Sequence, residues 1–395
     1  MEASQVTSVL TGCKCDEDQY GRLLPNGRSP CEWHFQFESL VENGHFNRIR
    51  SLAIAFYGGN ASGTGRIRLL LGSCRFFTLS FPGLTALSWD NQSSDTPEYA
   101  EYLFTTPPFL PTIRSLTYAG CWSNMITPVS NLTSFIFEGG IFAKEVDVED
   151  VRLFLLNNQS LESLEFQFVI FEGSPEGPPV HLLNIKSLVI GLASTELSTV
   201  MRVPALSRLS SLRISASQDD YVLRAVGDGI TFSVRHLGEE FWSVWERLTG
   251  YARPVIRRIR LDGDMKTAGL HDRSATFASM LLDAHILEIG DGYFPFWYDG
   301  FVEDLQQLGS QLKILRFAIP EEMELFGGNG GDEEDRDILL GEITELVKYR
   351  FEHGRPLSSV ERMVVGGDER SNRQQDFVWR CFYRSYMLGQ YVQPA

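Results

Sequence analysis

The first candidate site is a set of arginines that stand among apolar residues in segments typical of short strands. They are Arg213, Arg258, Arg260, Arg316 and Arg362. A guanidinium group binds a carboxylate or a phosphate through two parallel hydrogen bonds, so a column of arginines can hold an anionic peptide of another protein. The alternative is that the chain's own acids, such as Asp262 and Glu288, neutralise these arginines in solvated surface pairs.

A second candidate site is the loop 291–300, which follows the strand predicted to end at Ile289. Aromatic side chains bury a large area at low entropy cost and often dominate binding to other proteins. The candidate binding residues are Tyr293, Phe296, Trp297 and Tyr298. The alternative is that Phe294, Phe296 and Trp297 fill the core beneath the loop, because large apolar residues are more often buried.

Metal and cofactor sites are not expected. Cys13, Cys15, Cys31 and His34 carry zinc-ligand atoms, but their spacing matches no common zinc module, and we expect reduced thiols instead. The acidic loop 327–337 lacks the alternating ligand spacing of a calcium loop.

Catalytic motifs are also missing from the sequence. The glycine-rich segment 58–65 has no lysine for a phosphate loop, and no zinc-protease or serine-hydrolase motif is present. We therefore expect a protein that is not an enzyme. A hydrolase whose catalytic residues meet only in the folded chain is the alternative.

Strands that recur along the chain would position these residues. Each repeat reads apolar-x-x-apolar-x-x-apolar-x-apolar, and the last two apolar positions predict a strand with one buried face, because side chains alternate across a strand. The third apolar positions are Leu52, Leu87, Leu116, Phe135, Leu164, Leu188, Leu212, Ile259, Leu287, Leu315 and Met363. Most intervals are close to the ~20–29 residues of one leucine-rich coil, and two are longer, after Leu212 and after Leu315.

Helical patterns fill the intervals between these strands. They cover 66–72, 146–157, 239–249, 275–283, 301–308 and 336–353. Strands joined by crossover helices run parallel. The sequence therefore predicts an α/β fold, an irregular leucine-rich-repeat-like solenoid with a curved parallel sheet and helices on its outer face. We expect one solenoid over 1–395, with a capping or degenerate repeat at 1–45, repeats at 46–319, and a C-terminal repeat and cap at 320–395.

The repeats, taken with the C-terminal stretch 345–363 and the phrase Asn157-Asn-Gln-Ser-Leu-Glu-Ser-Leu, resemble the repeat region of fungal F-box proteins over about residues 6–365. The resemblance implies a substrate receptor of a cullin-type ubiquitin ligase, with the repeats binding the protein to be ubiquitinated. Nothing before Phe46 resembles the F-box that would bind a Skp-type adaptor. A truncated gene, a fragment, and a free-standing repeat scaffold without a ligase role all remain open.

Charge and composition exclude some classes of partner and location from the prediction. The formal net charge of −16 repels nucleic-acid phosphates and anionic membranes, so neither is an expected partner. The first residues lack the order of a signal peptide, and no apolar run approaches the ~20 residues that span a bilayer. We expect a cytoplasmic or nuclear monomer that binds a protein on the concave face of its sheet.

Overall fold

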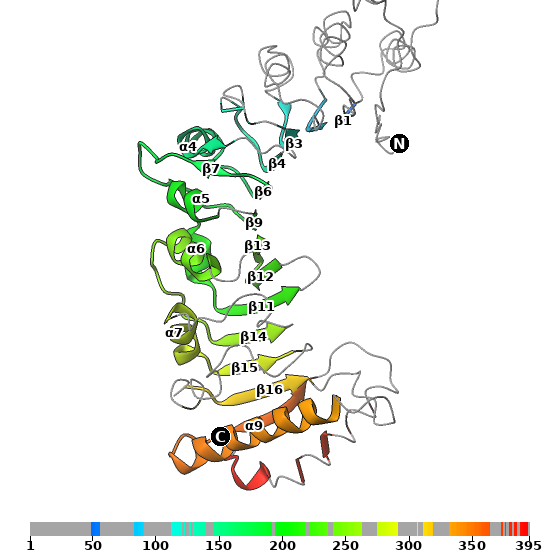
Figure 1. Ribbon diagram of the computed structural model, residues 1–395, viewed down its shortest axis with the longest axis vertical. Helices are drawn as coiled ribbons and strands as arrows, with labels where there is room; N and C mark the ends of the chain where they lie inside the picture. Colours follow the sequence, from blue (N-terminus) through cyan, green and yellow to red (C-terminus); the bar gives the residue numbers. More distant parts are fainter. Residues whose placement is uncertain are drawn as a thin grey trace, which may run out of the picture. The chain divides into compact units, whose positions relative to one another are not determined.

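The computed structural model describes residues 49–55, 83–90, 112–120, 122, 126–127, 129–139, 145–191, 194–217, 222–235, 240–262, 275–290, 306, 311–318, 332–363, 373, 376, 379–380, 383–384 and 388–393. The chain forms two compact units, Met1–Arg202 and Val203–Ala395. Both are α/β, with mostly parallel main-sheet strands and few helices in the described residues (Figure 1). No helix in these ranges is long and apolar enough to cross a membrane.

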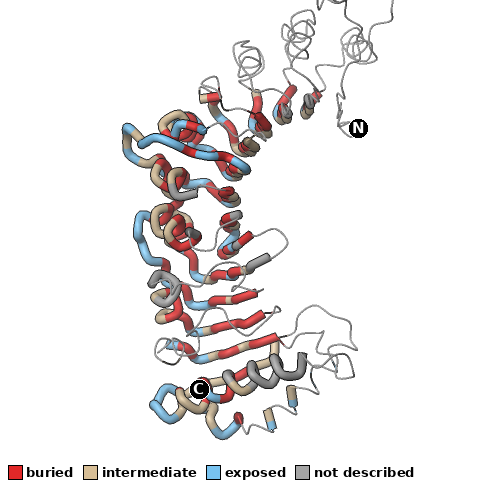
Figure 2. The backbone as a smooth tube through the Cα atoms, viewed as in Figure 1, coloured by how far each residue is buried: buried red, intermediate tan, exposed pale blue. Residues whose placement is uncertain are grey.

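The first unit has a parallel sheet whose strands follow one another in chain order. They are β1 (Ser51–Ala55), β2 (Ala86–Asp90), β3 (Ser115–Gly120), β4 (Ser134–Gly139), β6 (Ser163–Gln167) and β9 (Ser187–Ile190). Corresponding repeat positions pair directly, so Leu87, Leu116 and Phe135 lie in one row and are buried. Buried residues recur from strand to strand along this sheet (Figure 2).

The connections of the first unit contain helices and short strands. They are β5 (Val146–Asp147), α4 (Val148–Asn157), β7 (Phe171–Glu172), β8 (Val180–His181), α5 (Ser194–Val200) and β10 (Met201–Arg202). Helix α4 begins where the Asp147 side chain accepts the Glu149 N–H, which satisfies a backbone donor of the first turn. The connection 168–186 contains no helix, and none of the expected helical segments falls there. Its prolines and glycines disfavour helix.

A buried asparagine joins successive repeats of the first unit. Asn158 accepts the Leu132 N–H through Oδ1 at 2.9 Å, and its Nδ2 donates to the carbonyls of Val129 and Phe154. The side chain is fully buried, so these bonds satisfy backbone groups that would otherwise lose their partners on leaving water. Asn158 is also the acceptor residue of an Asn-Gln-Ser glycosylation sequence, and its side chain is buried in the folded protein.

The second unit begins with η4 (Pro204–Arg208) and contains a longer sheet. Its strands are β11 (Ser211–Ser217), β12 (Val222–Gly227), β13 (Ile230–Arg235), β14 (Arg258–Asp262), β15 (Ile286–Ile289), β16 (Ile314–Ala318) and β17 (Ser359–Met363). Its other elements are α6 (Glu240–Thr249), α7 (Ala275–Asp283), α9 (Asp332–Glu352) and η5 (Leu388–Gln390). The sheet order is β13-β12-β11-β14-β15-β16-β17.

The expectation of a wholly parallel sheet was wrong in the second unit. Strand β12 runs antiparallel to both β11 and β13, whereas β11 and β14 to β17 are parallel. The reason is the two-residue turn Asp228–Gly229, whose φ angles of 45° and 81° are both positive. Such a turn matches the twist of an antiparallel hairpin, and Gly adopts positive φ without steric cost. The hairpin and α6 occupy the long interval after Leu212.

The last repeat also differs from its predicted register. Val360, not Met363, pairs with Leu315, and Met363 pairs with Ala318. The buried Leu357 therefore stands three residues before the position that pairs with Leu315. Beyond it, the ring of Trp379 contacts Phe317 edge to face, and Leu357 forms a parallel bridge with Val392. These contacts place described residues of the C-terminal segment against the final strands.

Four of the expected helical segments are present in the structure. Those at 146–157, 239–249, 275–283 and 336–353 match α4, α6, α7 and α9 within a few residues. Helix α9 begins four residues earlier than expected, at Asp332. The expected helix at 66–72, nearly all of that at 301–308, and the N-terminal cap at 1–45 lie outside the described residues.

Candidate functional site

The open face of the second unit is defined here as the sheet face opposite the buried apolar rows. In β11, Arg213 lies between the buried residues Leu212 and Ile214, and the same alternation places Arg260 and Arg316 on the open face. Parallel pairing then sets Arg213 opposite Arg260 on the adjacent strand. The row continues through Glu288, Arg316 and Glu361, so positive and negative side chains alternate from Arg260 onward.

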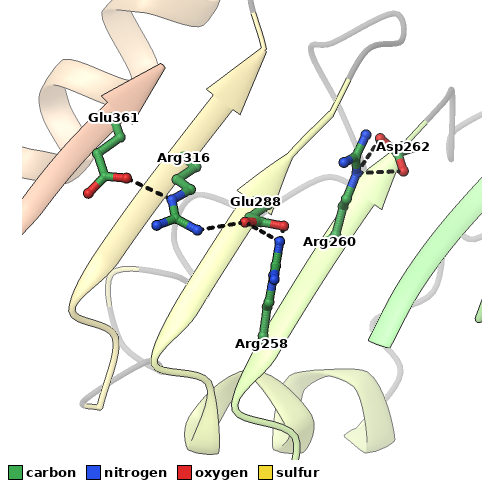
Figure 3. Close-up of polar contacts among 6 residues, drawn as sticks. All are labelled: Arg258, Arg260, Asp262, Glu288, Arg316 and Glu361. Carbon is green, nitrogen blue, oxygen red and sulfur yellow. Dashed lines mark hydrogen bonds and ion pairs between the residues drawn. The ribbon is translucent and has the colours of Figure 1, made fainter. Parts of the chain in front are cut away.

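Two carboxylates of the open face bind the arginines. Asp262 accepts Nε hydrogen bonds from both Arg213 and Arg260. Figure 3 shows those from Arg260, at 3.0 and 3.1 Å. Glu288 accepts Arg258 through both of its oxygens, at 2.9 and 3.0 Å, and Arg316 Nη1 at 3.0 Å. The alternative interpretation, pairing with the chain's own Asp262 and Glu288, is therefore present in the fold.

The pairs are asymmetric in their burial. Only 2 % of the Glu288 side chain and 9 % of the Asp262 side chain are exposed, whereas Arg213 and Arg258 are each 53 % exposed. A buried carboxylate needs ion pairs and hydrogen bonds to offset its lost hydration. The carboxylates thus hold the guanidinium groups in position, while about half of each Arg213 and Arg258 side chain stays exposed.

The row ends in a short hydrogen-bond network on β16 and β17. Glu361 accepts the Ser359 hydroxyl at 2.6 Å and Arg316 Nε at 2.7 Å, and these bonds lower the pKa of the Glu361 carboxyl. The same bond to Glu361, followed by that to Glu288, raises the pKa of the Arg316 guanidinium. Hydrogen bonds to a charged group favour its charged form, so both ends of this network stay ionised near neutral pH.

Arg362 does not belong to the open face, and its predicted position was wrong. The register slip in β17 pairs it with the buried Phe317, and only 7 % of its side chain is exposed. Its Nη1 atom lies 3.3 Å from Asp376 Oδ1. Glu361 takes the place that the sequence interpretation gave to Arg362.

Sequence reasoning missed Arg224, which lies on the antiparallel strand β12. Arg224 is exposed, pairs with Ser215 of β11, and therefore shares the open face with Arg213. Its Nε atom lies 3.4 Å from the hydroxyl of Ser233. The sequence held a signal, because Asp228-Gly229 between two alternating segments is a strong hairpin pattern.

The first unit carries a different open face. Its central row consists of Ala53, Ser88, Thr117, Ile136, Glu165 and Val189. This row has one charged residue, Glu165. Small side chains suit the close spacing of parallel strands, and they leave the row without strong binding chemistry of its own.

The other candidate positions lie beyond the described residues. These are the aromatic residues Tyr293, Phe296, Trp297 and Tyr298, the zinc-type residues Cys13, Cys15, Cys31 and His34, and the glycine-rich segment 58–65. Within the ranges that the structure describes, no three His, Cys, Asp or Glu side chains group closely enough to hold a metal ion.

Comparison with known proteins adds no relative. No protein-family model matches the chain, no curated protein matches it, and no solved structure matches its fold.

Proposed function

We propose that this chain is a non-catalytic protein-recognition module, an irregular leucine-rich-repeat-like solenoid that binds another protein on the open faces of its strands. The observation that carries the proposal is the lateral register. Residues at equivalent repeat positions pair with one another on neighbouring strands. Their side chains, which differ in type, therefore form straight rows on the face opposite the apolar core. Rows of this kind give a partner a rigid, pre-organised surface.

The chemistry of the second unit favours a protein over other ligands. Arginine is enriched at binding hot spots. Here buried carboxylates hold the guanidinium groups in position in the absence of a partner. The formal net charge of −16 opposes nucleic-acid binding, because a strongly acidic protein repels a phosphate backbone. An acidic or phosphorylated segment of a protein can bind the arginines locally, even though this chain as a whole is acidic.

The resemblance to F-box repeat regions extends this proposal to a role as a ligase substrate receptor. Its test is co-purification of a Skp-type adaptor with the tagged chain expressed in its source organism. Stoichiometric adaptor supports the ligase role. A partner that is recovered without adaptor supports a free-standing scaffold instead.

The binding face itself is tested with charged substitutions on its rows. Thr117→Arg, Val189→Arg and Ile314→Arg each place a long cation on an open face, where it would clash with a docked partner. Leu183→Arg and Val255→Arg are the matched controls, one in each unit, at side chains that are already well exposed. Quantitative affinity purification should show partners lost with at least one open-face variant and kept with both controls. Identical partners for all five variants would overturn the proposal.

A further inference from the structure

Three arginines of the second unit meet where the antiparallel hairpin joins the parallel strands. Arg213 of β11 pairs with Arg260 of β14, while Arg224 of β12 and Asp262 of β14 both pair with Ser215 of β11. Directly paired residues on a sheet share one face. The three arginines therefore lie on the open face of three adjacent strands, around the position of Ser215.

These arginines keep hydrogen-bond donors for a ligand. Arg213 and Arg260 use Nε to bind Asp262, and Arg224 uses Nε toward Ser233. Among the described residues, none of the three uses a terminal Nη group in a hydrogen bond or ion pair. A guanidinium carries five N–H donors in a fixed plane, so anchoring through Nε leaves its outer edge available.

The local charge distinguishes this cluster from the rest of the row. Arg213, Arg224 and Arg260 outnumber Asp262 three to one, which gives a local charge of +2 among these four groups. The neighbouring set is balanced, because Arg258 and Arg316 are matched by Glu288 and Glu361. The excess cation of the open face is thus concentrated around Ser215, in a chain of net charge −16.

We propose that Arg213, Arg224 and Arg260 form a binding site for the phosphomonoester of a phosphorylated side chain on the protein partner. A phosphomonoester carries a charge of about −1.5 to −2 near neutral pH and has three strong acceptor oxygens, which match the local charge and the three donor groups. A carboxylate carries only one negative charge and has two acceptor oxygens, so it matches the local charge of +2 less well. The inference rests on the proposed function, and it deepens that function by naming the chemistry that the partner must carry.

The test is a titration of the full chain with the peptide Gly-Ala-phosphoserine-Ala-Gly, followed by calorimetry. The unphosphorylated peptide, the peptide with Glu in place of phosphoserine, and inorganic phosphate serve as comparison ligands. The phosphopeptide should bind at least about tenfold more tightly than the Glu peptide, as expected from the extra charge-assisted hydrogen bonds. Equal affinity for the Glu peptide, or tighter binding of inorganic phosphate than of phosphopeptide, overturns the assignment.

Substitutions then locate the site. Arg224→Gln removes a cation that does not touch Asp262, so it should weaken phosphopeptide binding about tenfold while near-ultraviolet circular dichroism stays unchanged. Arg213→Gln should weaken it similarly, and Arg213→Lys should restore part of the affinity. Arg253→Gln is the matched control, because Arg253 pairs with Asp283 away from the cluster. Unchanged binding by the Arg224 variant overturns the site. Even if the phosphopeptide does not bind, loss of protein partners with the Thr117→Arg or Val189→Arg variant would support the proposed function.

Discussion

Glu288 and Arg316 lie opposite each other on the parallel strands β15 and β16, and Glu288 Oε1 accepts a hydrogen bond from Arg316 Nη1 at 3.0 Å. The carboxylate is almost fully buried, although it lies on the face that carries the arginines. Arg258 binds it from the other side. The carboxylate therefore depends on its two arginines for stability, and the arginines depend on it for position.

Removing Arg316 should destabilise the second unit. Arg316→Leu leaves the buried Glu288 with one cation instead of two, and we expect the free energy of unfolding to fall by about 1–3 kcal/mol. The measurement is urea unfolding of the full chain. The double variant Arg316→Leu with Glu288→Leu should recover part of the loss, because it leaves no buried charge behind.

Lys348→Met is the control for this variant. The Lys348 side chain is 34 % exposed, close to the 30 % of Arg316, but its partner Glu345 is 68 % exposed. An exposed pair contributes at most about 1 kcal/mol, so the control should change stability little. Equal losses from Arg316→Leu and Lys348→Met would show that the burial of Glu288 is unimportant.

The hairpin turn should confer an acid-sensitive contribution to stability. Asp228 accepts the backbone N–H of Ser210 and the hydroxyls of Ser210 and Ser211, and the Ser210 N–H bond is the main cause that lowers its pKa below the ordinary value of 3.8. A carboxyl with a lowered folded pKa stabilises the fold above its unfolded pKa. That contribution disappears as the pH falls below 3.8 through the folded pKa.

Asp228→Asn tests this contribution, because Asn also suits the positive φ of the turn. We expect a loss of about 1 kcal/mol at pH 7 and a smaller dependence of stability on pH between about 5 and 2. Unfolding curves at several pH values measure both effects. A variant whose pH dependence equals that of the parent would contradict the role of Asp228.

The register of the last strand can be checked by truncating two apolar residues. Val360 is buried in the row of Leu315, whereas Met363 is only partly buried. Val360→Ala should therefore lower the free energy of unfolding by about 1–3 kcal/mol and Met363→Ala by less. The reverse order of losses would instead support the register in which Met363 occupies the row.

Asn158 should be essential to the first unit, whereas its neighbour Asn157 should not. Asn158→Ala leaves the Leu132 N–H and the Val129 carbonyl buried without this side chain, so we expect a loss of about 2–4 kcal/mol. Asn157→Ala removes only an exposed bond from Nδ2 to the Thr127 carbonyl. Hydrogen exchange at the Leu132 amide should accelerate in the Asn158 variant alone. Similar exchange in both variants would argue against the role of Asn158.

Much of the strand content was visible in the sequence. The alternating apolar pairs placed Leu116, Leu164 and Leu287 on buried faces, because apolar residues at every second position indicate which face of a strand is buried. The same alternation placed Arg213, Arg260 and Arg316 on the opposite face. The helical pattern expected at 146–157 matches α4 (Val148–Asn157), whose first turn the structure shows capped by the Asp147 side chain.

The sequence by itself determined which residues alternate between the two faces of each strand, since that information is local and depends on residue type. Only the tertiary structure decided which strands are neighbours, in which direction they run and in which register they pair. Those choices depend on hydrogen bonds between strands. They placed Arg224 on the same face as Arg213, turned Arg362 to the face of Phe317, and buried Glu288 between two arginines. A side chain's partner is therefore a property of the assembled sheet, whereas its face is a property of its own strand.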